Sequence, residues 1–454
     1  MTRYTSATDA DRSEMLATIG VGSIEELFAD IPAGVRLDRP LALGAGLSEQ
    51  EVFDEFRELA ARNVSAEDEV SFLGAGMYDH YVPALIDSII MRSEFLTPYT
   101  PYQPEISQGG LQAMFEYQTA ISELTGLPVS NASVYEGPSA VAAAGYVAKH
   151  TNRRARFVIS RGVHPHARET LRTHAHAWGM EVVEAPLAAG ATDLPDLDDD
   201  VSAVIVGQPN FLGAVEDLTS IAQAAHDAGA LLIAACDPLP LALLKTPGEC
   251  GVDIAVGEGQ SLGNRLDFGG PSFGFFAATE ALMRRIPGRI AGETRDVDGK
   301  RGFVLTLQTR EQHIRREKAT SNICTAQALN ALAGVIYLSW LGRHGIVELA
   351  ELMLQRTAYA RERLNAIEGV TPVHDRPVVR EFAVELDAPV QEVIARCREQ
   401  GVNPGYALGR DYPEHENGLL VAITERRSRA DIDRLAGALG SAVAAERPAV
   451  EAKA

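Results

Sequence analysis

The sequence predicts an α/β protein in which a large, doubly wound and mostly parallel sheet domain precedes a small α+β domain. Between residues 110 and 280, short and fully apolar segments alternate with helical segments. Strands of this composition are buried on both faces, which requires helices on both sides of a mostly parallel sheet. Beyond residue 322, a long helical stretch leads into a second, shorter alternation of strands and helices. A chain of 454 residues is long enough for both domains.

Each element of the large domain is expected from its apolar pattern and from the residue that ends it. Two of the helices end at Gly126 and Gly229, and right-handed crossovers connect the strands. The expected strands are 157–159, 204–206, 231–235, 254–256 and 273–277, and the expected helices are 112–124, 137–150, 165–178 and 218–228.

The two ends of the chain are predicted as a helical arm and a C-terminal domain. Thr8 and Asp11 have the spacing of a capping box and open the first helix of the arm. Residues 325–341 are apolar nearly all round, which is typical of a buried helix, and an amphipathic helix follows up to Leu364. Strands are then expected at 382–386 and 419–423, and helices at 389–400 and 429–444. The expected domains are 1–70, 71–330 and 331–454.

Charge and cysteine content exclude several classes of protein. Acidic residues outnumber Lys and Arg by 62 to 41, so affinity for a nucleic-acid backbone is not expected. The N-terminus lacks an apolar signal core and no apolar run reaches ~18 residues, so we expect a cytoplasmic chain without a membrane segment. The cysteines are scattered, and neither a zinc site, another metal site nor a disulfide framework is expected; they are Cys236, Cys250, Cys324 and Cys397.

A large α/β domain, a connecting helix and a small domain are typical of the aspartate-aminotransferase-like architecture, fold type I of the pyridoxal-phosphate (PLP) enzymes. Such an enzyme needs a Schiff-base lysine, a strand-end carboxylate for the pyridine nitrogen and a helix N-terminus for the phosphate. Asp237 directly follows the strand 231–235 and is the candidate carboxylate. No lysine lies between Lys245 and Lys300, and Gln260 and Ser261 stand where one is expected. Either the fold interpretation is wrong, or this chain is not the one that carries the cofactor.

The segment Tyr99-Thr-Pro-Tyr-Gln-Pro-Glu-Ile-Ser-Gln-Gly109 is the second candidate for chemistry. Tyr99, Tyr102, Gln103 and Glu105 place two phenols, an amide and a carboxylate in one loop. Its prolines reduce the entropy that is lost when polar groups are held in position. A packed turn before a helix explains the same composition, so the residues alone leave both interpretations open.

Three further features carry weaker signals. His80 and His164 have no partner at metal-ligand spacing, and their roles stay open. Gly269-Gly270-Pro271 has the composition of a phosphate-binding loop, although most such triplets are plain turns. Arg426 and Arg427 are expected on a solvated face.

The 99–109 segment, together with several later segments, resembles the P-protein of the glycine cleavage system, glycine dehydrogenase (decarboxylating). The match covers nearly the whole chain in order, and YTPYQPEISQG is its most specific part. Other matching segments are Met15–Val21, Leu27–Pro32, Leu124–Pro128, Ser130–Ser133, His164-Pro165, Gln208–Phe211, Asp237–Gly248, Gly269–Pro271 and Thr320–Gln327.

The resemblance implies a division of labour between two chains. In many bacteria this enzyme is split into halves, and only the second half, the β chain, carries the Schiff-base lysine. The present chain resembles the first half, the α chain, so PLP is expected to be bound covalently by the partner β subunit and not by this chain. The implied reaction is the decarboxylation of glycine, followed by transfer of the aminomethyl group to the lipoyl arm of H-protein. The implied partners are glycine dehydrogenase subunit 2 (the β chain) and lipoylated H-protein, with T-protein and dihydrolipoamide dehydrogenase as functional partners.

In this interpretation the 99–109 loop is supplied in trans to a shared active site. Tyr99 and Tyr102 are expected to stack on or hydrogen-bond to the cofactor, and Gln103 and Glu105 to orient the substrate. Asp237 is expected to be a relic without a pyridine ring to contact.

Two other hypotheses stay open. One is a structural or regulatory pseudo-enzyme subunit that holds the β chain in shape without touching substrate. The other is an independent PLP lyase or transaminase that uses Lys300 or Lys318.

Overall fold

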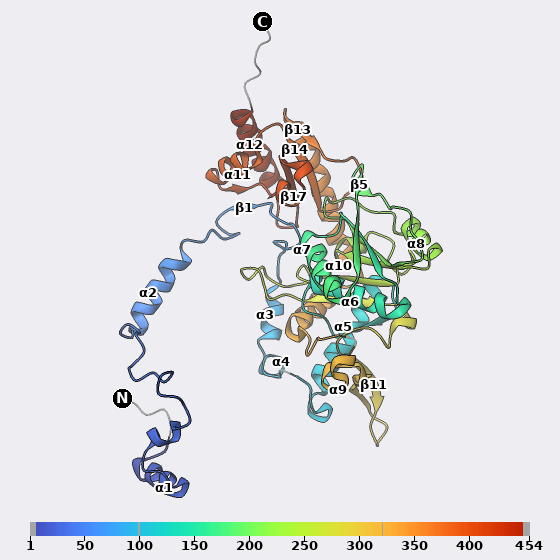
Figure 1. The fold of residues 1–454 in the computed structure, drawn as a ribbon. Helices are drawn as coiled ribbons and strands as arrows, with labels where there is room; N and C mark the ends of the chain where they lie inside the picture. Colours follow the sequence, from blue (N-terminus) through green and yellow to red (C-terminus); the bar gives the residue numbers. More distant parts are fainter. Residues whose placement is uncertain (1–5, 99, 320, 448–454) are drawn as a thin grey trace. The chain divides into compact units, whose positions relative to one another are not determined.

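The computed structural model describes residues 6–98, 100–319 and 321–447 (Figure 1). The chain forms two compact units, one up to Val64 and one from Ser65 onward. Of the predicted site residues, Tyr99 lies outside the described residues. No helix in the described part of the chain is both long and apolar enough to cross a membrane.

The first unit contains the helices that the sequence predicts for the arm. The capping box of Thr8 and Asp11 is confirmed at the start of the first helix, since each residue's side chain accepts a hydrogen bond from the other's backbone. None of the described residues of this unit is buried. Its elements are α1 (Asp9–Ile19), the 3-10 helix η1 (Ile24–Phe28) and α2 (Glu49–Ala60).

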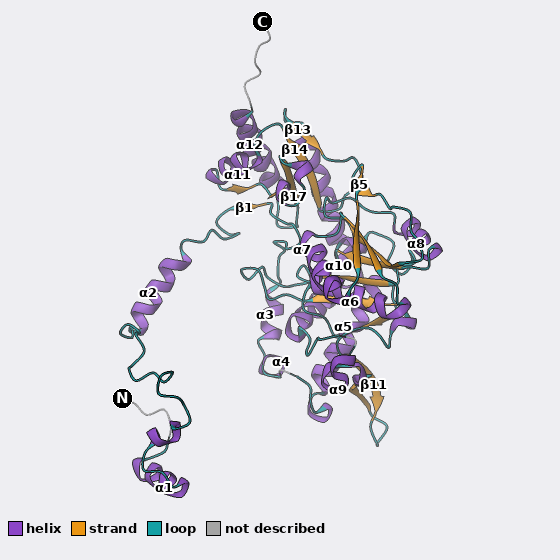
Figure 2. Ribbon diagram, viewed as in Figure 1, coloured by secondary structure: helices purple, strands orange, loops and turns teal. Residues whose placement is uncertain are grey.

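A seven-stranded sheet forms the centre of the second unit, in the order β2-β10-β9-β8-β7-β3-β4. Figure 2 shows orange strands of this unit with purple helices around them. The five strands from β9 to β4 are parallel, whereas β10 runs antiparallel to both of its neighbours. The predicted α/β class is therefore confirmed. The strands are β2 (Val129–Ser130), β3 (Arg156–Ser160), β4 (Glu181–Ala185), β7 (Val201–Gln208), β8 (Leu231–Cys236), β9 (Ile254–Glu258) and β10 (Gly274–Ala278).

Helices cover both faces of this sheet, as its apolar strands require. Successive residues of β7 alternate between two buried clusters, with Val204 in one and Ile205 in the other. The first cluster packs against α3 (Ala84–Ile90), α5 (Gln108–Thr125), α8 (Leu218–Asp227) and α10 (Ala328–Asn365). The second packs against α6 (Gly137–Asn152) and α7 (Pro165–Trp178).

A smaller four-stranded antiparallel sheet, in the order β13-β14-β17-β16, has a buried cluster of its own. Its strands are β13 (Val370–Pro372), β14 (Glu381–Leu386), β16 (Tyr406–Ala407) and β17 (Gly418–Ala422), and the helices α11 (Val390–Glu399) and α12 (Arg429–Glu446) contribute to the cluster. The short strands β1 (Val70–Ser71) and β15 (Val402–Asn403) pair in parallel beside it. Each sheet has a core of its own, and the core of the large sheet includes residues of α10 as far as Met353, whereas that of the small sheet begins on α10 at Ala360. The boundary near residue 330 stays a prediction.

The two helices predicted between 325 and 364 are both present within α10, and they meet at Gly342. This residue has φ +61° and ψ −177°, a conformation that side chains with a Cβ rarely adopt. Glycine therefore permits the change of direction between the two helical parts.

The sequence analysis did not predict strands that are only partly buried. The edge strand β4 is only half-buried, so it lacks the apolar run that marks the central strands. The hairpin of β11 (Ile290–Arg295) and β12 (Arg301–Thr306) carries charged residues at its outer end, and it connects to α9 (Gln312–Arg315). A short helix α4 (Ser93–Leu96) and the turn η2 (Pro104–Ile106) precede α5.

Candidate functional site

A cavity of about 370 Å³ lies where the parallel strands β7, β8 and β9 end. The carboxyl edge of such a sheet is the usual ligand site of doubly wound folds. The cavity is also lined by residues 75–78, by the N-terminal residues of α6 and α7, and by Arg380 and Glu381 at the start of β14. It therefore lies between the two sheets of the second unit.

Asp237, the predicted carboxylate, lines this cavity and forms an ion pair with Arg380. Asp237 follows β8, and its Oδ2 accepts a hydrogen bond from Nε of Arg380 at 2.5 Å. Only 2% of Arg380 is exposed, and its guanidinium stacks on the ring of Tyr78 at 3.5 Å from the centroid. The contact of a buried cation with an aromatic face adds to the attraction between the charges. The carboxylate of Asp237 thus already has a cationic partner within this chain.

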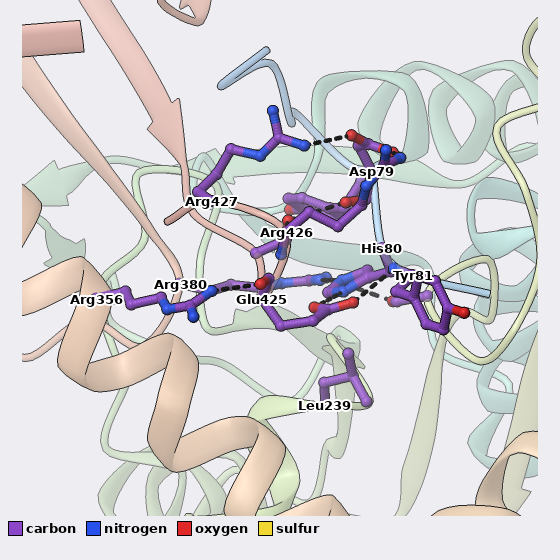
Figure 3. A network of polar contacts seen from close by, with 12 residues as sticks. Asp79, His80, Tyr81, Leu239, Arg356, Arg380, Glu425, Arg426 and Arg427 are labelled. Atoms are coloured by element: carbon purple, nitrogen blue, oxygen red, sulfur yellow. Dashed lines mark hydrogen bonds and ion pairs between the residues drawn. The ribbon is translucent and has the colours of Figure 1, made fainter. Parts of the chain in front are cut away.

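Arg380 also contacts His80, which in turn pairs with Glu425 (Figure 3). The Nη1 of Arg380 donates to Nε2 of His80, and Nδ1 of His80 contacts Glu425 Oε2 at 2.7 Å. A nitrogen that accepts from a guanidinium carries no proton, so Nδ1–H donates to Glu425. Glu425 also accepts from the backbone N–H of Tyr81 at 2.6 Å. His80, whose role the sequence left open, therefore connects the segment before α3 to the end of β17.

Glu381 is the second charged residue at the start of β14. Its Oε1 accepts from the N–H of Ala75 and its Oε2 from the hydroxyl of Tyr78, each at 2.8 Å. Burial raises the pKa of Glu381 to about 7, because water no longer stabilises its charged form. Burial also raises the pKa of Tyr78 well above its ordinary value. The phenol therefore stays protonated and donates.

The N-terminus of α6 also points into the cavity, and two carboxylates cap it. Glu136 accepts from the N–H and the hydroxyl of Ser139. Glu258, at the end of β9, accepts from Gly137 N–H at 3.0 Å and, through its other oxygen, from Gln260 N–H at 3.0 Å and Ser272 Oγ at 2.6 Å. Burial raises the pKa of Glu258, and these three donors act in the opposite direction.

Gln260 and Ser261 stand where the Schiff-base lysine was expected, and both are buried. The side-chain amide of Gln260 accepts from Tyr78 N–H at 2.9 Å and donates to Tyr78 O at 3.1 Å and Asn264 O at 2.9 Å. Ser261 accepts from Nη2 of Arg380 at 3.4 Å. Gln260 thus fixes the backbone that carries Tyr78.

His164 lies at the start of α7 and lines the same cavity. Its Nδ1 accepts from His166 N–H at 3.1 Å, and its Nε2 donates to Ala75 O at 2.8 Å. Burial lowers the pKa of His164, so the ring is neutral and caps the helix. Gly76 has φ +103°, and a Cβ there would come within 2.8 Å of His164 Nε2, so glycine is required at this crossing.

Residues 100–109, the part of the predicted loop that the structure describes, do not line this cavity. Gln108 holds the loop against β12, because its side-chain amide donates to Phe303 O and accepts from Phe303 N–H, both at 2.8 Å. Tyr102 is 77% exposed and Ile106 is 81% exposed, and Gln103 and Glu105 are exposed as well. Tyr102, Gln103 and Glu105 are therefore exposed on a loop whose end is held in place by Gln108.

The remaining sequence signals have simpler explanations. Among the described residues that line the cavity there is no lysine, and Lys300 and Lys318 are exposed. The N–H groups of Gly269 and Gly270 both donate to Leu266 O, so this triplet is a turn.

The interpretation of Arg426 and Arg427 as a solvated face was wrong. Both bond to Asp79, and Arg427 is buried (Figure 3). The interpretation failed because the local sequence shows the two arginines but not Asp79, the carboxylate that they contact.

No group of His, Cys, Asp and Glu with metal-binding geometry occurs within residues 6–98, 100–319 and 321–447.

Sequence reasoning missed three charged residues that line the cavity, namely Glu258, Arg380 and Glu381. It also missed Glu425, which contacts His80. Arg380 immediately precedes the strand β14, Glu381 is its first residue, and Glu425 closely follows β17. A charge directly beside a buried strand is the one local signal that marks them, and it does not identify their partners.

The fold and the position of the cavity define a protein of the PLP-dependent fold type I class. Two solved structures share this fold at low sequence identity. A cysteine desulfurase from Escherichia coli matches with TM-score 0.62 and 15% identity over 84% of this chain and 96% of its own. A sphingosine-1-phosphate lyase from Burkholderia pseudomallei matches with TM-score 0.63 and 16% identity over 92% and 95%.

The chain belongs to the glycine cleavage system P-protein family, whose sequence profile matches residues 2–439. Probable glycine dehydrogenase (decarboxylating) subunit 1 of Geobacillus thermodenitrificans is 50% identical over 96% of this chain and 98% of its own length. The protein of the same description from Moorella thermoacetica is 51% identical over 96% and 98%. A crystal structure of glycine decarboxylase (P-protein) in inhibitor-bound form matches with TM-score 0.89 and 45% identity over 97% of this chain and all of that chain.

Proposed function

We propose that this chain is the α subunit of a two-subunit, cytoplasmic glycine decarboxylase of the glycine cleavage system. The β subunit carries PLP, and together the subunits decarboxylate glycine and transfer the aminomethyl group to the lipoyl arm of H-protein. The observation that carries the proposal is the full-length similarity to proteins described as subunit 1 of glycine dehydrogenase (decarboxylating). PLP, when bound, supplies the electron sink for the decarboxylation.

The residues of this chain's own cavity do not fit a bound PLP, which supports a cofactor held by the partner. Asp237 is paired with Arg380, the N–H of Gly137 already donates to Glu258, and no lysine is among the described lining residues. We therefore assign this cavity no step of the reaction.

The 99–109 loop is the part of this chain that we propose to act in the shared site. The pairing of Gln108 with Phe303 restricts the loop, and restriction lowers the entropy lost when Tyr102 and Glu105 meet a substrate. The exposure of these side chains supports a role outside this chain. In a shared site, Tyr99 and Tyr102 would contact the cofactor, and Gln103 and Glu105 would orient the amine.

The test is reconstitution with the β subunit and measurement of glycine-dependent exchange of carbon dioxide. The variants Tyr99→Phe, Tyr102→Phe and Glu105→Gln each keep the shape of the side chain but remove one polar group. Loss of a hydrogen-bonding group at a reacting centre typically lowers turnover by about 10²–10³-fold. The matched control is Glu351→Gln, at an exposed glutamate on α10. Unchanged turnover in all three loop variants, with the complex assembled, would favour the structural pseudo-enzyme instead.

The exposed hydrophobic residues of the N-terminal unit support the proposal that this chain has a partner subunit. Sixteen of the 27 exposed large hydrophobic residues of the described chain lie in this unit, which buries none of its own. Val52, Phe53, Phe56 and Leu59 follow helical spacing along α2. A stable interface takes about 20–30 residues from each partner, and this unit is long enough to supply them. The family profile matches this chain from residue 2 onward, so this unit is part of the region that P-proteins share.

We propose that this unit docks on the β subunit. Phe53→Ser and Phe56→Ser are expected to weaken assembly by at least tenfold, since each removes a large apolar side chain from an interface. Leu354→Ser on α10, at an exposed leucine, is the control. The measurement is the affinity of the two subunits by sedimentation, and unchanged affinity of both phenylalanine variants would contradict the docking.

A further inference from the structure

The cavity contains both of the charged positions that fold type I offers to its cofactor. One is the N-terminus of a helix, where unpaired N–H groups and the helix dipole favour an anion. The other is the carboxylate that follows a central strand and favours a cation. In this chain these positions are the N-terminus of α6 and Asp237.

The anion position is taken by Glu258. Its carboxylate accepts from Gly137 N–H in the first turn of α6, from Gln260 N–H and from the hydroxyl of Ser272. Three donors around one carboxyl group form the pattern that a phosphate would otherwise meet. Glu136 takes the N–H of Ser139 in the same turn, so a second negative group stands beside the first.

The cation position is taken by Arg380. It reaches Asp237 from the start of β14, is stacked on Tyr78, and also contacts His80 and Ser261. Every one of these partners is at least half-buried, so the guanidinium is held from several sides. Both charged positions are therefore filled from within the chain, by residues that come from different sheets.

We propose that Glu258 and Arg380 are internal substitutes for the phosphate and the ring cation of a cofactor, and that they close this cavity to phosphorylated ligands. The inference rests on the proposed function, in which the β subunit alone carries PLP, and it adds the physical reason. A phosphate entering this cavity would lose its donors to Glu258 and would meet two carboxyl groups. Removal of the Glu258 side chain, by contrast, would release three donors aimed at one point.

The experiment measures binding of inorganic phosphate to the full-length chain by titration calorimetry, with thermal unfolding as a second readout. Wild type is expected to show no saturable binding. Glu258→Ala is expected to bind phosphate saturably, because charge-assisted hydrogen bonds become available. Phosphate is also expected to raise the Tm of this variant selectively. Glu258→Gln, which keeps the volume of the side chain, is expected to show no gain.

Two controls make the result specific. Glu351→Ala removes the same charge from an exposed position on α10, and a gain equal to that of Glu258→Ala would overturn the proposal. Glu258→Ser provides the same test if the alanine variant does not fold. Phosphate binding by wild type as tight as by the variants, or a folded variant with no gain, would also overturn it. Because the readout is binding by this chain, failure here is distinct from failure of the loop experiment, whose readout is turnover of the complex.

Discussion

Replacement of Arg380 by methionine tests how strongly the buried ion pair with Asp237 stabilises the second unit in the absence of a ligand. Methionine keeps the apolar length of the side chain but removes the guanidinium that contacts Asp237, His80 and Ser261. Breaking a buried pair typically costs about 3–5 kcal/mol, because the remaining charge is left without compensation. Glu381, whose pKa burial already raises, would lose the same neighbouring cation. The expected loss in unfolding free energy therefore lies at the upper end of that range.

The assay is urea unfolding of the full-length chain, together with a double-mutant cycle. In a unit of this size, each kcal/mol shifts Tm by only about 1–2 °C, so the urea midpoint is the more sensitive measure. Asp237→Asn alone is also expected to destabilise, and the double variant is expected to recover about 1–3 kcal/mol relative to the sum of the single changes. The control is Arg363→Met, which breaks an exposed pair with Asp433 and is expected to cost less than about 1 kcal/mol. An Arg380→Met variant within about 1 kcal/mol of wild type, or strictly additive effects in the cycle, would refute the reasoning.

Three further predictions concern the same cavity. Neutral Glu381 contributes stability that is fully present below its unfolded pKa of 4.5 and is lost as pH rises through its folded pKa of about 7. The unfolding free energy of wild type, relative to that of Glu381→Gln, is therefore expected to fall as pH rises from 4.5 to about 7. A difference that does not change with pH would contradict the effect of burial. Gln260→Leu is expected to cost roughly 2–4 kcal/mol in urea unfolding, because the backbone N–H and C=O of Tyr78 lose their partner; a neutral result would mean that water replaces the amide. Asp237→Asn in the reconstituted complex is expected to leave the absorption spectrum of the bound cofactor unchanged, because Asp237 is paired with Arg380; a clear shift would show that this carboxylate contacts the ring.

The central strands of the large sheet were predictable because they follow from local patterns. A run of apolar residues in Leu231–Cys236 or Ile254–Glu258 identifies a strand buried on both faces, whatever its partners are. The absence of a lysine between Lys245 and Lys300 was equally visible, and it left two alternatives: a wrong fold interpretation, or a cofactor carried by another chain. The half-buried strand β4 and the polar hairpin β11–β12 were not predictable in this way, because their surroundings rather than their composition make them strands.

The sequence by itself determined the fold class, the strand that Asp237 directly follows, and the motif between residues 99 and 109. Only the tertiary structure decided what surrounds Asp237 and which residue fills the N-terminus of α6. Arg380 lies 143 residues from Asp237, and Gly137 lies 121 residues from Glu258, so no periodicity connects either pair. The hydrophobic effect acts on patterns along the chain and has no direction, whereas an ion pair or a hydrogen bond needs two groups at one point in space. The backbone has to fold before such a point exists.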